Sequence, residues 1–561
     1  MVTNKYITRI ASVIMAAAVI LCLMASLFSD KLQEVYGNNA VTMKYESKLF
    51  NTDQIMDIDI LMDEDDWNNM LENAISEEYY SCNVVVNGKT FYSVGIRPKG
   101  NTSLSFIAND PDTDRYSFKL EFDHYIEGQT CYGLDKLILN NNYADATNMK
   151  EAIVYDMYQY LGVDASLYNY AKISVNGDYR GVYLALEAVE DSFMLRNYGT
   201  EDGNLYKPES MGIGGGVDGN GFPQKGEMPD GEDFPQKGEM PDGEDFPQMG
   251  EAPNGEAADI KMGIMGGNGG ADLNYTDDDL DSYSTIWDGE ITDSDKKDHK
   301  RVVEALKNIS EGTDLETYMD VDNILKYMAV HTFVVNDDSL SGTMAHNYYL
   351  YEYNGKLNIL PWDYNLSFGG MSMGGKMGGQ SLGATSVIND AIDTPFSITD
   401  FFNALLENEE YLEQYHGYLN ELVEKYVNGG EFEKTYERIR SQIDDLVGND
   451  PTAFYSYEEY EEAANMLIEV VQLRAKSVSG QLAGTIPSTD EGQQQDSSNL
   501  IDGSDIDLSV MGSFSGGGGG NEGQGKDNGF AGTPQPFDAG DVSPISEEKA
   551  DLQDSNQDSV K

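Results

Sequence analysis

The chain has 561 residues, with 98 Asp and Glu against 36 Lys and Arg, a formal net charge of -62. One compact globule rarely carries so much acid, so the composition indicates solvated segments beside a folded part. An acidic surface repels phosphate backbones, which excludes nucleic acid as an expected partner. Hydrophobic residues still make up 40% of the chain, with 36 Tyr and 20 Phe, enough for a sizeable core.

The N-terminus has the pattern of an export segment. Lys5 and Arg9 precede an uncharged stretch over residues 10–29. A stretch of about twenty residues can cross a bilayer, and the preceding positive charges favour an inside N-terminus. We expect residues 1–30 to form a transmembrane signal anchor, with a cleaved signal peptide as the alternative. Either one makes the rest extracytoplasmic, membrane-anchored or secreted.

The positions of the cysteines and histidines say little about disulfides or metal sites. Cys22 lies in the apolar N-terminus, so Cys82 and Cys131 are the one remaining pair. Their spacing cannot show whether they form a disulfide. The five His are scattered and no C-x-x-C motif occurs, so no zinc site is predicted.

Residues 45 to 207 predict strands with one helix among them. Two Asn-Gly pairs predict hairpins: Asn87-Gly88 between strands 84–86 and 90–96, and Asn176-Gly177 between strands 171–175 and 179–186. Segment 116–122 alternates, with Phe118, Leu120 and Phe122 on one face and Lys119 on the other. A short strand is expected at 137–139 and a helix at 148–161, ended by Gly162.

Residues 209–272 break this pattern with a repeat insertion. A twelve-residue Pro/Gly/Glu-rich unit occurs at 222, 234 and 246, with one Phe in each copy. Such a unit buries too little apolar surface to offset the entropy of ordering it. We therefore expect a disordered insertion within the folded domain, and a three-unit solenoid is the less favoured alternative.

Folding resumes near Tyr275 and is helical for the most part. Helices are expected at 297–309, 321–331, 398–428 and 431–446, and strands at 346–353 and 357–362. A capping box, Ser456 with Glu459, begins a last helix that runs to about 478. Residues 485–561 are rich in Gly, Ser and Asp and are expected to be a disordered acidic tail without a core.

The densest polar motif lies between residues 334 and 370. A turn with Asp337 and Asp338 precedes a predicted hairpin, Asn347 lies at its start, and Asp363 follows its second strand. Phosphoryl transfer needs hard oxygen ligands for Mg²⁺ and one carboxylate beside the acceptor hydroxyl, which these residues could supply. The alternative is that the same residues simply cap turns.

Several segments in this order resemble the CotH family of atypical kinases, the spore coat protein H type. In the second half the resemblance is carried by N-x-D-S at 336–339, HNYYLYE at 346–352 and LPWDYNLSFG at 360–369. In the first half it is carried by the following segments: IRPKGNTS at 96–103, SFKLEF at 117–122, LNNNYADATNMKEAIVYDMY at 139–158, YRGVYLALEAVE at 179–190 and NLYKP at 204–208. The resemblance implies an α+β, protein-kinase-like bilobal fold over residues 45–480. A small β-rich lobe and a larger helical lobe would hold ATP with Mg²⁺ or Mn²⁺ between them.

The resemblance also implies roles for three residues of the first half. Lys119 would hold the nucleotide phosphates and Glu151 would pair with it, while Glu187 would lie at the hinge beside adenine. Each has a plainer alternative, in which Lys119 lies on a solvated strand face, Glu151 is a surface helix charge and Glu187 is a strand-end carboxylate.

In the second half, Asp338 resembles the catalytic Asp, Asp363 the metal ligand and Asn347 the second metal ligand. The family more often has Asp at the position of Asn365, so one carboxylate ligand is missing here.

The expected function is ATP-dependent phosphoryl transfer to Ser/Thr of surface or secreted proteins. The alternative is a non-catalytic, CotH-like surface scaffold or adhesin. A weaker third possibility is a wall-associated structural protein whose acidic tails gather Ca²⁺.

Overall fold

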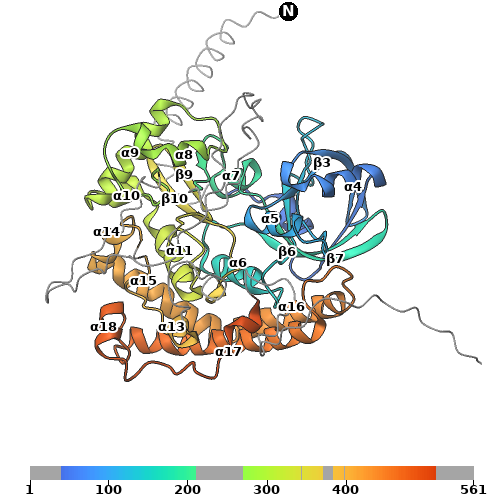
Figure 1. Ribbon diagram of the computed structural model, residues 1–561. Coiled ribbons are helices and arrows are strands. Elements are labelled where there is room, and N and C mark those ends of the chain that lie inside the picture. The colour runs from blue at the N-terminus through green and yellow to red at the C-terminus, as the bar shows by residue number, and fades with distance from the viewer. Residues whose placement is uncertain (1–39, 210–268, 343, 371–382, 397, 513–561) are drawn as a thin grey trace, which may run out of the picture. The chain divides into compact units, whose positions relative to one another are not determined.

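Seven strands of the first half close into a barrel in the computed structural model, which describes residues 40–209, 269–342, 344–370, 383–396 and 398–512 (Figure 1). The chain divides into two compact units, 1–519 and 520–561. The second unit lies outside the described residues, so everything below concerns the first. Helices and strands occur together, which confirms the α+β class.

The barrel has the strand order β1-β2-β3-β4-β5-β7-β6. Its strands are β1 (Met56–Leu61), β2 (Tyr80–Val86), β3 (Lys89–Lys99), β4 (Ser117–Glu121), β5 (Lys136–Asn140), β6 (Tyr168–Val175) and β7 (Asp178–Glu187). All neighbouring pairs are antiparallel except β1 with β6, whose parallel pairing closes the barrel.

Both predicted Asn-Gly hairpins are confirmed. Asn87 and Gly88 have φ of 50° and 79°, and Asn176 and Gly177 have φ of 53° and 88°. Positive φ at both central positions matches the right-handed twist of the strands that such a turn joins. The expected alternation of β4 also holds, because Phe118 and Leu120 are buried in the barrel core while Lys119 is only partly buried.

The second half is built around a three-stranded sheet with the order β10-β9-β8. Its strands are β8 (Asn204–Tyr206), β9 (Tyr348–Tyr353) and β10 (Lys356–Pro361). β9 and β10 form the predicted hairpin, turned at Asn354-Gly355, with Tyr348 opposite Pro361 at its open end.

Fifteen α-helices occur among the described residues. They are α3 (Lys44–Lys48), α4 (Glu64–Glu72), α5 (Thr102–Ala108), α6 (Lys150–Leu161), α7 (Asp191–Tyr198), α8 (Ser284–Asp288), α9 (Lys296–Ser310), α10 (Leu315–Tyr318), α11 (Val321–Val334), α13 (Ala384–Ile388), α14 (Asn403–Leu406), α15 (Glu409–Glu421), α16 (Glu431–Gly448), α17 (Tyr457–Leu482) and α18 (Asp490–Gln495). The long helices α16 and α17 run below both the barrel and the other helices in Figure 1.

The predicted single helix over 398–428 is wrong. The chain there forms α14, then α15, then a π-helix, η3 (Leu422–Val427). Asn408 causes the break, because its side chain accepts hydrogen bonds from the amides of Glu410 and Tyr411 and so begins a new helix. The capping box at Ser456 and Glu459 is confirmed at the start of α17.

Two predicted domain limits are also wrong. Residues 269–272 lie within the predicted insertion, but Ala271 is fully buried and its carbonyl accepts a hydrogen bond from the Tyr348 hydroxyl at 2.6 Å. Residues 485–512 lie within the predicted disordered tail, yet they contain α18 and a 3₁₀ turn, η4 (Leu508–Met511), whose Leu508 and Met511 are buried. The rest of the insertion, 210–268, and of the tail, 513–561, lies outside the described residues.

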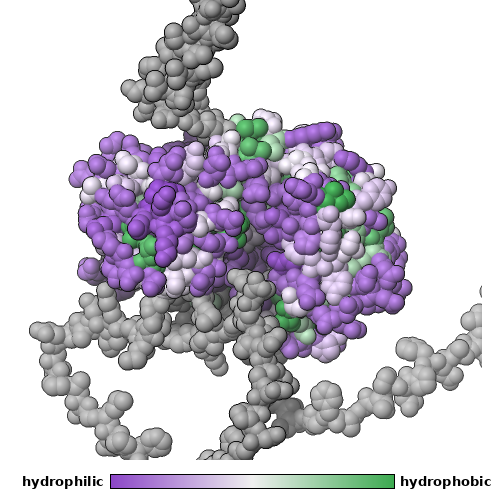
Figure 2. Space-filling model, turned by 90° about the horizontal axis from the view of Figure 1, so that it is seen from above, coloured by the Kyte–Doolittle hydropathy of each residue, from purple (hydrophilic) through white to green (hydrophobic). Residues whose placement is uncertain are grey.

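The expected anchor at residues 1–30 also lies outside the described part. Within that part, no helix has both the length and the apolar character needed to cross a membrane. Cys82 and Cys131 are buried free thiols, so the structure contains no disulfide between them. The surface in Figure 2 is mostly hydrophilic with small separate hydrophobic patches, as the acidic composition leads one to expect.

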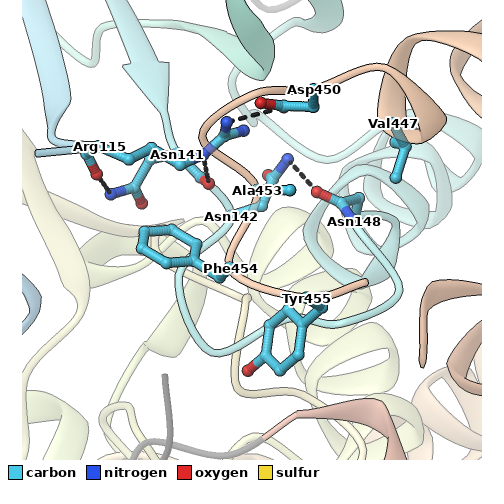
Figure 3. A pocket seen from close by; sticks show the side chains of 9 residues that line it. All are labelled: Arg115, Asn141, Asn142, Asn148, Val447, Asp450, Ala453, Phe454 and Tyr455. Carbon is cyan, nitrogen blue, oxygen red and sulfur yellow. Dashed lines mark hydrogen bonds and ion pairs between the residues drawn. The ribbon is translucent and has the colours of Figure 1, made fainter. Parts of the chain in front are cut away.

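A buried arginine ties the barrel to the helical part. Arg115, before β4, donates to Asp450 in the α16–α17 loop at 2.7 Å (Figure 3). It also donates to the Val182 carbonyl in β7 at 2.6 Å. Both charged side chains are 2% exposed. Gly181 is required beside them, since a Cβ there would lie 2.3 Å from the Arg115 guanidinium. The cavity next to this pair, about 10 Å³, has room for one water molecule.

Replacing Arg115 by Met should destabilise the chain strongly, because it leaves Asp450 buried without its countercharge. The expected loss in free energy of unfolding is about 3–5 kcal/mol. Chemical denaturation measures it, and Lys434→Gln, which breaks an exposed ion pair with Glu431, is the control expected to change little. Equal stability of both variants would show that this pair does not hold the barrel in place.

Candidate active site

The N-x-D-S turn is held by the end of α11. The helix stops at Val335, which has φ of 48°, an unfavourable value for a β-branched residue. Ser339 then bonds back to the Asn336 carbonyl at 2.7 Å, and the Asn336 amide makes a long contact of 3.4 Å with the Asp363 carbonyl. This turn therefore touches the segment that carries the second candidate aspartate.

The β9–β10 hairpin brings Asn347 and Asp363 to one place. Because Tyr348 pairs with Pro361, the residues just outside the pairing emerge at the same end of the hairpin. Asn347 and Asp363 have φ of 57° and 59°, and the nearby Ala345 has 46°. Left-handed backbone in residues other than glycine costs roughly 1–2 kcal/mol each, and such strain clusters at functional sites.

Asp338 is held between His346 and Asn347. One carboxylate oxygen lies 2.9 Å from His346 Nε2, and Asn347 Nδ2 donates to the other at 3.0 Å and to the Asp338 carbonyl at 2.9 Å. Burial lowers the pKa of His346, but Asp338, Asp363 and Glu209 outweigh it, so the pKa is raised overall. The side-chain amide of Asn347 donates both of its hydrogen bonds to Asp338, so the side-chain oxygen of Asn347 is available to a ligand.

Asp363 lies among charges of both signs. Burial raises its pKa, and the nearby Asp338 carboxylate raises it further. Lys99, Lys207 and His346 are close enough to act in the opposite direction. The structure therefore brings Asp338, Asn347 and Asp363 together, as predicted, and adds three basic side chains that the prediction did not include.

Glu151, on the first turn of α6, belongs to the same cluster. Its Oε2 accepts a hydrogen bond from Asn140 at 2.8 Å, and Asn140 in turn accepts one from Lys99 Nζ at 3.2 Å. Its other oxygen, Oε1, is buried without a hydrogen-bond partner. Burial, with a further contribution from Asp363, raises the pKa of Glu151 to about 8.

The predicted pairing of Lys119 with Glu151 is wrong. Lys119 lies 2.5 Å from Glu190, and Lys136 pairs with the same carboxylate. Burial raises the pKa of Glu190, but the two lysines outweigh it and the pKa is lowered. It is Lys99, at the end of β3, that lies near Glu151 and Asp363.

The predicted adenine contact by the Glu187 side chain does not fit the structure. Its carboxylate is fully buried in an ion pair with Arg196 at 2.6 Å and accepts the Tyr45 hydroxyl at 2.5 Å. Its backbone amide bonds to the Leu167 carbonyl at 2.9 Å. The strand-end alternative describes Glu187 better.

The residues missed by the sequence reasoning had a usable signal. Lys99, Lys207 and His346 all lie inside the motifs that carry the family resemblance, IRPKGNTS, NLYKP and HNYYLYE. No role was assigned to them because spacing along the chain does not show which side chains meet. Burial lowers the pKa of Lys99, which Asp363 and Glu151 partly offset, so this ammonium group is poorly solvated.

The oxygens of this cluster fit a hard divalent cation. Asp363, the partnerless Glu151 Oε1 and the Asn347 oxygen are ligands of the kind that Mg²⁺ and Mn²⁺ prefer. Across the described ranges, no three His, Cys, Asp or Glu side chains are arranged to hold a metal by themselves. An ion here would therefore take further ligands from water and phosphate, as Mg²⁺ usually does.

Comparison with known proteins gives one family. The family model described as "CotH kinase protein" matches residues 96–478, more than half of the chain. No curated protein matches the sequence.

Glu151→Gln should make the metal-free protein more stable at alkaline pH. A raised carboxyl pKa means that the unfolded chain releases the proton first, so wild type loses stability as pH rises from about 4.5 to about 8. The loss has a slope of at most about 1.4 kcal/mol per pH unit, and Gln avoids it.

Thermal melts in EDTA between pH 5 and 9 measure this difference. Wild type and Glu151→Gln should have the same melting temperature at pH 5. The difference in melting temperature in favour of the variant should grow up to about pH 8 and then stay constant. Adding Mn²⁺ should stabilise wild type more than the variant. A constant offset at every pH would mean that Glu151 does not titrate in the folded protein as inferred.

Proposed function

Because this chain belongs to the CotH kinase family, we propose that it transfers a phosphoryl group from Mg²⁺- or Mn²⁺-bound ATP to Ser or Thr hydroxyls of surface or secreted proteins. The supporting observation is the convergence of Asp338, Asp363, Glu151 and Lys99, which four separate segments bring to one site. The nucleotide would lie between the barrel, which supplies Lys99, and the helical part, in the bilobal manner of kinases.

Lys99 is the proposed phosphate contact, in place of Lys119. Its ammonium group is near both candidate metal ligands, and it is poorly solvated, so an anionic partner would gain from it. Lys207 also lies near Asp363, but it forms an ion pair with Glu209, so Lys99 is the better candidate. Lys119 is already neutralised by Glu190.

Asp363 and Glu151 are the proposed metal ligands, with Asn347 beside them. These residues would hold a divalent ion, whose charge would offset the negative charge of the phosphoryl group. Deprotonated Glu151 is needed for this, so its raised pKa predicts that metal binding improves as pH rises.

Asp338 is the proposed acceptor-side residue. His346 and Asn347 fix both of its carboxylate oxygens, so it is oriented before a substrate arrives. In this role Asp338 accepts the hydroxyl proton and aligns the oxygen for attack. The raised pKa of His346 favours its protonated form next to this carboxylate.

Location and substrate rest on the sequence. The segment over residues 10–29 supports an extracytoplasmic protein, anchored to the membrane or secreted, and a protein at the cell surface as substrate. A scaffold that has kept the fold without the chemistry is the alternative, and nucleotide binding separates the two.

Replacing the two aspartates should affect different steps. Asp363→Asn should weaken Mg²⁺-dependent ATP binding and lower turnover, because it removes charge beside the metal. Asp338→Asn should leave ATP affinity nearly unchanged and lower turnover by about 10²–10⁴-fold, the usual scale of general-base catalysis. Calorimetry of ATP with Mg²⁺ and transfer of labelled phosphate to a surface-protein fraction measure the two effects.

Asp322→Asn, the same substitution at an exposed position on α11, is the matched control. If wild type binds no nucleotide, the scaffold alternative holds. If wild type transfers phosphate and both site variants do so equally well, the chemistry lies elsewhere.

Replacing Lys99 and replacing Lys119 should have different effects on ATP affinity. Lys99→Ala should weaken ATP binding about tenfold or more, since a hydrogen bond to a charged group contributes about 1.5–3 kcal/mol. Lys119→Ala should change it much less, because Lys119 serves Glu190. The reverse order in calorimetry would return the phosphate role to Lys119.

A further inference from the structure

The segment after α17 lies outside the family match, which ends at residue 478, yet it is ordered and packed. After α17 ends at Leu482, the chain reverses and runs back over the helical part through α18 and η4 (Figure 1). Ile486, Leu508 and Met511 are each at most 4% exposed. Residues 485–512, called the C-terminal clamp below, therefore add to the fold that the family match covers.

The clamp first binds the chain around Asn389, which is fully buried at the end of α13. Asn389 and Ile501 exchange two hydrogen bonds, of 2.9 and 2.8 Å. Gln493 donates to the Asn389 carbonyl at 2.7 Å, and the Ser488 carbonyl accepts from the Asp393 amide at 2.8 Å. These contacts fix α13 and the residues that follow it.

The clamp next reaches the segment that follows Asp363. Gly503 donates to Thr385 at 3.0 Å and lies so close that a Cβ would be 2.8 Å from the Thr385 nitrogen. Leu508 packs on Gly369, whose amide bonds to the Val335 carbonyl at 3.3 Å. Val335 begins the turn that carries Asp338, so this end of the clamp supports both aspartate segments.

The last residues of the clamp reach the segment that precedes Glu151. The Met511 carbonyl accepts a hydrogen bond from the Ala146 amide at 3.1 Å, and Gly512 lies against Ala144 and Ala146. In the same loop, Asp145 accepts the amide of Lys150, the first residue of α6, at 3.0 Å. The clamp thus contacts the loop that sets the first turn of α6, which bears Glu151.

We propose that the C-terminal clamp is a positioning element of the active site, which fixes Glu151 relative to Asp363 by binding the loop before one and the segment after the other. This rests on the proposed function only in naming those two carboxylates as metal ligands. Groups that orient metal ligands from outside the first shell commonly change metal affinity by about 10–100-fold when they are lost. The clamp residues are positioning residues and touch neither metal nor substrate.

The test uses the full chain with Leu508→Ser and Met511→Ser together, which removes the two apolar anchors of η4. Val510→Ser, the same kind of change at a neighbouring residue that is only partly buried, is the control. Gly503→Ala is a milder second variant, because its Cβ would push the clamp from α13 without removing a core side chain. It keeps the proposal testable if the double variant fails to fold.

Mn²⁺ titration followed by the paramagnetic signal of the free ion is the first readout. The double variant should bind Mn²⁺ about tenfold more weakly than wild type. In a Glu151→Gln background the same change should cause little further loss, because the clamp acts by holding Glu151 in place relative to Asp363 and that carboxylate is then already absent. Unchanged affinity, or an equal loss in both backgrounds, would overturn the proposal.

Hydrogen exchange without metal or nucleotide is the second readout. Loss of the clamp should speed exchange at residues 144–153 and 363–370 and leave the barrel strands protected. Unchanged exchange rates in those two segments would overturn the positioning role of the clamp, even if the kinase proposal stands. If wild type binds no Mn²⁺, the proposed metal site fails, and the exchange pattern alone decides whether the clamp joins the two segments.

Discussion

The pairing of Tyr348 with Pro361 at the open end of the β9–β10 hairpin is the contact on which the candidate site depends. It places Asn347 and Asp363, sixteen residues apart in sequence, at one end of a two-stranded unit. A shift of one residue would turn every side chain of a strand to the opposite face. The tight Asn354-Gly355 turn prevents this, because it sets the register from the other end.

The balance of charges around Asp363 then decides which ligands the candidate site can bind. The chain as a whole repels anions, with a net charge of -62, but Lys99, Lys207 and His346 gather around Asp363. Burial is the main reason why the pKa of Asp363 and that of Glu151 are both raised, and a neighbouring carboxylate adds to it, Asp338 in the case of Asp363 and Asp363 in the case of Glu151. Under the proposed function, a divalent ion bound to these carboxylates would reduce the repulsion between them, and Lys99 would then face the phosphates.

Two long-range ties keep the parts of the site in place. The Arg115–Asp450 pair joins the barrel, the source of Lys99, to the loop between α16 and α17. The C-terminal clamp leaves the far end of α17 and returns to Ala146 and Gly369. The Arg115–Asp450 pair precedes α17 in the chain and the C-terminal clamp follows it. The geometry of the site is therefore linked to α17, although this helix contributes no site residue.

Local chemistry in the sequence determined the hairpins, the helix caps and the family. Asn-Gly turns, strict alternation in β4 and the capping box at Ser456 act within a few residues, so they can be read without the fold. The grouping of Asp338, Asn347 and Asp363 was also predictable, because one hairpin and one turn contain them all.

Only the tertiary structure shows which lysine lies near the candidate site. Lys99 lies opposite Ser117 and Arg97 opposite Lys119, so Lys99 and Lys119 share one face of the β3–β4 pair, two residues apart along the strands. Alternation cannot separate them. In the folded chain Lys99 donates to Asn140, which donates to Glu151, whereas Lys119 pairs with Glu190. The packed course of residues 485–512 was hidden for a related reason: its Gly, Ser and Asp residues give no local pattern, and its few buried side chains pack on α17 and on segments such as Gly369 that are far away in the sequence.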